Sequence, residues 1–156
     1  MTYTIPASTP APTLDPIPEH VEKPQRCVIV LDRALPPGKA ANAAAVIALT
    51  IGQRHPGLVG EPLIDASEHS HPGLIPIGIP VLAASREELS SLRSQAITLG
   101  CDIVDFPEQG QQTTNYAAFR DAVADVHTVH LSYVGVALIG AKKPISKAVA
   151  HLELLK

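Results

Sequence analysis

One stretch of this chain, residues 27–53, constrains the fold more than any other, because a strand, a turn and a helix follow one another in it directly. It opens with the apolar run CVIVL, which is short and β-branched and is therefore typical of a strand buried on both faces. Pro36-Pro37-Gly38 then ends the strand and starts a helix, because proline fits the first turn of a helix but not its interior. The stretch predicts a strand–helix unit of an α/β protein.

The helix expected from Ala40 to Ile51 is almost entirely small or apolar. Its polar neighbours fall on one narrow arc when they are placed at the helical repeat. This arc is made of Lys39, Asn42, Thr50 and Gln53. The pattern predicts a buried helix that points a few functional groups into a shared hollow.

Composition limits the classes of partner. The chain has 156 residues, which favours one domain, and it carries a net charge of −3 with an aromatic fraction of only 3%. Phosphate backbones require clustered Lys and Arg, and single strands require aromatic platforms, so an extended nucleic-acid surface is not expected. No long apolar run or signal-like start is present, so we expect a cytoplasmic protein without a membrane segment.

The rest of the chain divides into a tail and a domain. Residues 1–24 contain six prolines and are expected to form an extended tail, and residues 25–156 are expected to form a single domain. Residues 74–84 alternate isoleucine with proline and glycine, which predicts an edge strand that could pair with a second subunit of a homodimer. A helix should follow from a capping box of Ser85 and Glu88.

Alternation of strands and helices continues to the end of the chain. Further strands are expected at residues 101–106, 131–139 and 151–155, and further helices at 114–124 and 145–150. In the helix at 114–124 the side chains expected to pack inward are Tyr116, Phe119 and Val123. The order of elements predicts an α/β fold, a three-layer α/β/α sandwich with a mostly parallel mixed sheet.

Three segments of the chain resemble known families. The segments CVIVLD…GKAANAAA, HPGLIPIGIPVLAASREELSSL and VALIGAKKPISKAVAHLELL resemble, in this order, the start, middle and end of type 2 peptidyl-tRNA hydrolases. The PG…NAAA, HPG…PVL and VALIG motifs are still more similar to bacterial proteins grouped as domain of unknown function 2000. Both resemblances imply the hydrolase-type fold. Hydrolysis of an ester- or amide-linked substrate is implied only by the resemblance to the peptidyl-tRNA hydrolases.

The match to the hydrolases is incomplete at their polar residues. That family carries a Gln and a His where this chain has Ala43 and Val46, and an Asp-Ala-Gly-x-Thr motif where this chain has residues 108–113, EQGQQT. The Lys–Asp–Thr set that the resemblance implies is therefore only partly present. Transfer RNA is an acidic ligand and would face an acidic protein, so binding of tRNA is not favoured. It stays open as the nucleic-acid ligand that the resemblance to the hydrolases implies.

The candidate site is centred on the start of the first helix. Lys39 is the predicted base or oxyanion-binding group, because a partly desolvated lysine has a lowered pKa, and His71 and Thr114 are the predicted catalytic helpers. The predicted ligand-binding residues are Asn42, Asp32, Gly38 and Thr113.

Metal and cofactor chemistry is not expected. Asp65, His69 and His71 gather in one predicted loop, but no further ligand follows at a spacing typical of metal sites. The glycines do not form a phosphate loop or a dinucleotide fingerprint either. Two functions stay open, namely a small hydrolase and a non-catalytic module that binds a small molecule or a peptide.

Overall fold

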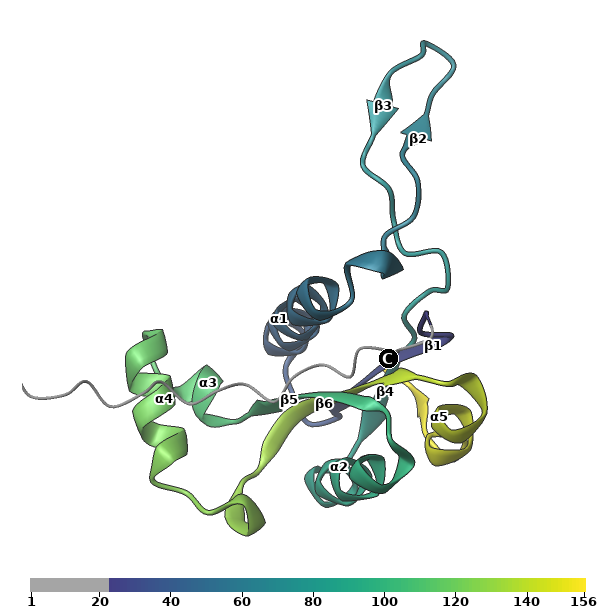
Figure 1. Ribbon diagram of the computed structural model, residues 1–156. Helices are drawn as coiled ribbons and strands as arrows, with labels where there is room; N and C mark the ends of the chain where they lie inside the picture. The colour runs from purple at the N-terminus through teal and green to yellow at the C-terminus, as the bar shows by residue number, and fades with distance from the viewer. Residues whose placement is uncertain (1–22) are drawn as a thin grey trace, which may run out of the picture.

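The computed structural model describes residues 23–156, so the predicted proline-rich tail lies outside the described residues except for its last two positions. Five strands form the main sheet, in the spatial order β5-β6-β1-β4-β7, and two short strands form a separate hairpin (Figure 1). The strands are β1 (Arg26–Asp32), β2 (Leu63–Ile64), β3 (Ser70–His71), β4 (Val81–Ala84), β5 (Asp102–Pro107), β6 (Tyr133–Gly140) and β7 (Glu153–Leu154). The helices are α1 (Pro37–Arg54), α2 (Arg86–Leu99), α3 (Gln109–Gln112), α4 (Tyr116–Ala124) and α5 (Lys142–Ala148), with short 3-10 turns η1 (Pro56–Leu58) and η2 (Thr128–His130).

The predicted strand directions are wrong. Only β1 and β4 pair in parallel, whereas β1–β6, β5–β6 and β4–β7 are antiparallel, so the mixed α/β fold has a mostly antiparallel sheet. The prediction assumed that each helix carries the chain back across the sheet. The connection from β5 to β6 through α3 and α4 instead leaves and re-enters the sheet at the same end, which makes β6 antiparallel to both of its neighbours (Figure 1).

Helices lie on both faces of the sheet, α1 on one face and α2 and α5 on the other (Figure 1). Strand β1 is buried between them, and its side chains alternate between two hydrophobic clusters. Ile29 and Leu31 face α1, whereas Val28 and Val30 face α2 and α5. The uninterrupted apolar run of β1 follows from this burial on both faces.

The sequence suggested that helix α1 is buried, but only one side of it is buried. One side packs on the sheet through Ala40, Ala43, Ile47 and Ile51. The opposite side faces solvent, and Leu49 there is 78% exposed. Alanine is found both in helix interiors and on helix surfaces, so an alanine-rich sequence does not by itself show a second packing face.

The strand predicted at residues 74–84 is mostly a loop. Only Val81–Ala84 is a strand, and β4 pairs on both sides, with β1 and with β7, so it is not the predicted edge. Pro76 and Pro80 lack an amide donor for a strand ladder, and Gly78 between them has a positive φ of 69°. The alternating isoleucines therefore occur in a loop, where Ile75 and Ile79 still pack against the α1 cluster.

One of the three side chains of α4 that were predicted to pack inward does not do so. Tyr116 is 74% exposed, and its ring lies edge-to-face with the ring of Phe119, with 6.0 Å between the ring centroids. Phe119 does pack inward against Phe106 of β5, at 6.1 Å. Helix α4 contacts the main core mainly through this one ring, because it lies at the end of the sheet rather than across a face (Figure 1).

Within residues 23–156, no helix combines the length and the apolar character that a membrane crossing requires.

The predicted capping box of α2 is present and allows a first prediction. The Ser85 hydroxyl accepts the amide of Glu88 at 3.2 Å, and the Glu88 carboxylate accepts the amide of Ser85 at 2.7 Å. We expect Ser85→Ala to lower the free energy of unfolding by about 1 kcal/mol, because it leaves a helix amide without its acceptor. Urea unfolding measures this loss. Ser94→Ala, on the exposed side of the same helix, is the matched control and should be nearly neutral, and equal losses in the two variants would contradict the assignment.

Candidate functional site

Polar residues from several elements converge at one end of the sheet. Strands β1 and β4, which are parallel neighbours, both end there, and each leads directly into a helix, α1 or α2. Strand β5 ends and β6 begins at the same end. Ligands of α/β proteins often bind beyond the carboxyl ends of parallel strands, and this end is therefore the candidate site.

Asp32 closes β1 and is a buried structural anchor at this end. Asp32 is only 3% exposed. One carboxylate oxygen accepts the amide of Ala34 at 2.9 Å, and the other accepts Nε of Arg86 at 2.8 Å. Both oxygens are therefore occupied, and Asp32 shapes the turn before α1 rather than offering a free base.

Arg86 is one of the residues of this site that the sequence analysis did not identify. It stands in the first turn of α2 and also donates to Glu108, which follows β5, and to Ser132 Oγ before β6 at 3.4 Å. The hydrogen bonds to Asp32 and Glu108 raise the pKa of Arg86, so it is a permanent cation that joins the ends of three strands. No local motif marks Arg86, because its importance depends on which strands are neighbours.

Lys39 and Asn42, both predicted for the site, lie together on the first turns of α1 and contact α3. The side-chain amide of Gln111 donates to the Lys39 carbonyl at 2.9 Å and to Asn42 Oδ1 at 3.3 Å. The Lys39 side chain is exposed and has no ion-pair partner among residues 23–156. The structure thus brings together Lys39, Asn42 and the segment after β5.

The start of α1 has unsatisfied amides. Its N-cap residue is Pro36, which provides no side-chain cap, and the first turn contains no acidic residue. The Ala40 amide bonds to the Pro36 carbonyl, so the amides of Gly38 and Lys39 precede the first intrahelical bond, and no side chain in the described part of the chain accepts from them. Free amides, the helix dipole and the Lys39 ammonium all favour an anion at this point.

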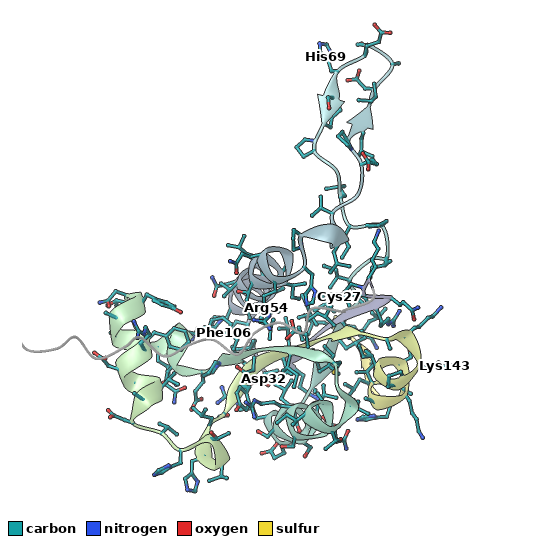
Figure 2. All side chains as sticks on the ribbon, viewed as in Figure 1. Cys27, Asp32, Arg54, His69, Phe106 and Lys143 are labelled. Carbon is teal, nitrogen blue, oxygen red and sulfur yellow. The ribbon has the colours of Figure 1, made fainter. Side chains whose placement is uncertain are left out.

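His71 is not brought to this site. It lies in β3, where its Nε2 is 3.0 Å from Asp65 Oδ2, and the β2–β3 hairpin follows the far end of α1. Figure 2 labels the neighbouring His69 at the outer end of this hairpin, well apart from Asp32. Lys39 is at the start of α1, which is roughly 27 Å long, and the hairpin that carries His71 follows the other end of this helix.

The two predicted threonines stand between α3 and α4. The Thr113 hydroxyl donates to the Gln109 carbonyl at 2.7 Å and so closes α3. Thr114 is exposed, and the next residue, Asn115, caps α4. Neither threonine hydrogen-bonds to α1 among the described residues, so only Gln111 of this segment reaches the Lys39 end.

A cavity of about 400 Å³ lies beside this end of the sheet, on the side of α2. Arg33 and Glu88 line it and form an ion pair at 2.7 Å, and His151 and the last residues of the chain complete the wall. The amide of Ser85 first, and then Arg33, hold the pKa of Glu88 below its usual value. Lys39 and Asn42 do not line this cavity, and both are exposed.

No serine, cysteine or threonine here pairs with a base in the manner of an activated nucleophile. Across residues 23–156, no three His, Cys, Asp or Glu side chains gather closely enough to hold a metal ion.

Comparisons with known proteins place the chain in a family. A solved structure, that of the protein of unknown function Atu0240 from Agrobacterium tumefaciens strain C58, matches with a TM-score of 0.75 and 21% identity over 83% of this chain and 96% of that chain. At this identity the match shows the fold alone. No functionally curated protein matches the chain. The model of the family described as protein of unknown function (DUF2000) matches residues 25–156, and the chain therefore belongs to the DUF2000 family.

Proposed function

We propose that this protein is a cytoplasmic, non-catalytic module that binds a small carboxylate- or phosphate-bearing molecule, or the carboxyl end of a peptide, at the start of α1. The observation that carries the proposal is the uncapped first turn of α1, with an exposed Lys39 and no acidic neighbour. A helix start of this kind attracts an anion, which would satisfy amides that no side chain among residues 23–156 caps.

The surroundings of this turn support a rigid binding surface. The hydrogen bond from Arg86 to Asp32 holds the turn before α1 in place. Gln111 of α3 holds the first turn of α1 through the Lys39 carbonyl. Asn42 Oδ1 already accepts from Gln111, and its NH₂ group, which donates to no described residue, can serve as a donor to a ligand. A ligand would then meet two backbone amides, an ammonium group and a side-chain amide, all of which are donors.

Binding of phosphate and of short peptides with a free carboxylate tests the proposal directly. In titrations followed by NMR, we expect the amide signals of Gly38 and Lys39 to shift together. Lys39→Ala should weaken binding about 10-fold or more, since a hydrogen bond to a charged group contributes about 1.5–3 kcal/mol. Lys142→Ala, which removes an exposed lysine from α5, is the matched control and should leave the affinity unchanged. Binding that is indifferent to Lys39, or shifts confined to other amides, would refute the proposal.

A hydrolase of an ester- or amide-linked substrate is the second candidate. Its support is the contact of Gln111 with α1, because that segment stands where the type 2 peptidyl-tRNA hydrolases carry their Asp and Thr. If this second candidate is right, we expect the three-layer arrangement of the hydrolase family, and tRNA becomes a possible ligand. It predicts turnover in a panel of esters and amides that Lys39→Ala abolishes without a change in melting temperature. Binding without turnover in that panel leaves the first candidate.

A further inference from the structure

Another cavity, of about 360 Å³, lies against α4, the helix at the end of the sheet (Figure 1). Its volume is in the range of ligand pockets, about 300–1,000 Å³, and such pockets are mostly apolar with a few polar groups. The lining residues are Pro107, Tyr116, Phe119, Arg120, Val123 and Ala124. We propose that this cavity binds a small aromatic carboxylate, with the ring against Tyr116 and Phe119 and the carboxylate on Arg120. The residues at the start of α1 do not line it, so this is a separate site from the one proposed above.

The spacing of residues along α4 builds the cavity wall. Counted from Tyr116, the other four lining residues of the helix follow at three, four, seven and eight positions, and these positions share one face of a helix. Pro107, which closes β5, supplies the remaining wall. Four of the six residues are apolar or aromatic without a charge at neutral pH, besides the tyrosine, and Arg120 is the one charged residue among them.

The aromatic part of the wall is held in place before any ligand binds. The Phe119 ring packs on the Phe106 ring with 6.1 Å between centroids. Gly110 of α3 fits closely against both rings, because a Cβ there would overlap Phe106 and would lie 3.0 Å from Phe119 Cζ. Tyr116 then stands at 79° to Phe119. Two fixed rings at nearly a right angle offer a third ring both an edge and a face, and their fixed geometry lowers the entropic cost of binding.

Charge selects an anion as the ligand. Arg120 is exposed and forms no ion pair with any of residues 23–156. Four other arginines each bind a carboxylate, namely Arg33, Arg54, Arg86 and Arg93. The nearby Glu108 is bound by Arg86, and Asp121 and Asp125 do not line the cavity. The Arg120 guanidinium is therefore free to bind a carboxylate, which its planar fork fits with two hydrogen bonds.

The size of the cavity favours a small molecule over a protein partner. Six residues line it, whereas a stable protein interface takes about 20–30 residues on each side. One guanidinium beside two aromatic rings matches one carboxylate attached to an aromatic group. Both parts of such a ligand are needed for binding, and this requirement can be tested with ligands that lack one part.

Three probes separate the two parts, namely indole-3-acetate, its neutral amide indole-3-acetamide, and acetate. The chain contains no tryptophan, so the fluorescence of the indole ring reports binding without interference from the protein. We expect indole-3-acetate to bind with a dissociation constant of about 1 mM or lower. The amide should bind about 10-fold more weakly or worse, because it loses the charge, and acetate should show no saturation. No saturation by indole-3-acetate up to about 10 mM, or equal affinities for the acid and the amide, would overturn the proposal.

Variants of exposed residues assign the binding to this cavity. Arg120→Gln should weaken binding of indole-3-acetate about 10-fold or more and leave the affinity for the amide unchanged, because only the charged contact is lost. Tyr116→Ala should weaken binding of both, since it removes one ring, and folding should persist because Tyr116 is 74% exposed. Lys143→Gln, which removes an exposed positive charge from α5, is the matched control and should bind as the wild type does. Binding that Lys39→Ala abolishes and Arg120→Gln retains would place the ligand at the start of α1 and would overturn the proposal.

Light scattering tests whether a second copy of the chain occupies this face of α4 instead. A small ligand leaves the assembly unchanged, so we expect the same mass with and without indole-3-acetate, and the same mass for Arg120→Gln. A mass that falls when the ligand is added, or in the variant, would show that the face is an interface between copies and would overturn the proposal.

Discussion

We expect Gly135→Val to destabilise the folded protein strongly. Gly135 lies in the middle of β6, paired with Leu31 of β1, under the helix α1. A Cβ at this position would lie 2.7 Å from Ile47 Cδ1 and 2.7 Å from Leu31 Cδ2, inside a core that has no room to move. Valine adds two further methyl groups, so we expect a loss of about 3 kcal/mol or more in the free energy of unfolding.

Gly52→Ala is the matched control for this prediction. Gly52 lies within α1, and a Cβ there would meet nothing within 4 Å. Alanine should stabilise the helix by about 0.5–1 kcal/mol, because glycine loses more backbone entropy on folding. Urea unfolding of the two variants compares them. If Gly135→Val were as stable as the wild type, helix α1 could not pack on β6 at the distance the structure gives.

The fold could be predicted where the signal is local. The strand β1, the proline-initiated α1 and the capping box at Ser85 depend on neighbours within one or two turns, and all three are present. Strand direction depends on where a connection re-enters the sheet. The link from β5 to β6 contains helical segments, as a parallel crossover does, and nothing local in its residues shows that it returns at the same end.

The β2–β3 hairpin is also only partly predictable from local sequence signals. Asp65, His69 and His71 were expected in a loop, and part of that loop is the strand β2, at Leu63–Ile64. Its partner β3 was not expected, because Ser70 and His71 have no strand-like pattern. The pairing is fixed instead by the turn at Asp65 and by the close approach of Gly60 and Gly73 at the base, which act across the whole hairpin.

Some residues of the candidate site could be predicted from the sequence, and others could not. Lys39 and Asn42 are one turn apart, and their common location follows from helical spacing alone. His71 was assigned to the same site on its chemistry, although the hairpin holds it at the far end of α1. Arg86 joins Asp32 to Glu108 only because β4 is the neighbour of β1 and because β5 ends at the same side of the sheet. Residues of this kind can be identified only once the strand order is known.

At the opposite end of α1, an ionic cluster joins the helix to β5. Arg54 in the last turn of α1 donates two hydrogen bonds to the Asp102 carboxylate, at 2.8 and 2.7 Å. Nε2 of the buried His55 lies 2.7 Å from the same carboxylate. Asp102 is therefore the shared acceptor of two side chains, and the charges sit at the helix C-terminus, where the dipole favours cations.

Asp102→Ala removes that shared acceptor, and we expect it to lower the free energy of unfolding by about 2 kcal/mol at neutral pH. Breaking a fully buried ion pair costs about 3–5 kcal/mol, and solvent reaches part of this cluster, which reduces the loss. His55, which remains buried, loses its partner in the variant. Asp125→Ala, which removes an exposed carboxylate after α4, is the control and should change stability little.

The pH dependence of this loss identifies its cause. Burial raises the pKa of Asp102, but the hydrogen bonds from Arg54 and His55 outweigh burial and hold the pKa below its usual value. A carboxylate with a lowered pKa in the folded state stabilises the protein fully above its unfolded pKa of about 3.9, and this stabilisation disappears as the pH falls through the folded value. Urea unfolding from pH 7 down to pH 3 should therefore show a wild-type stability that approaches that of Asp102→Ala in acid. A difference between the two proteins that stays constant over this range would mean that Asp102 acts by packing rather than by charge.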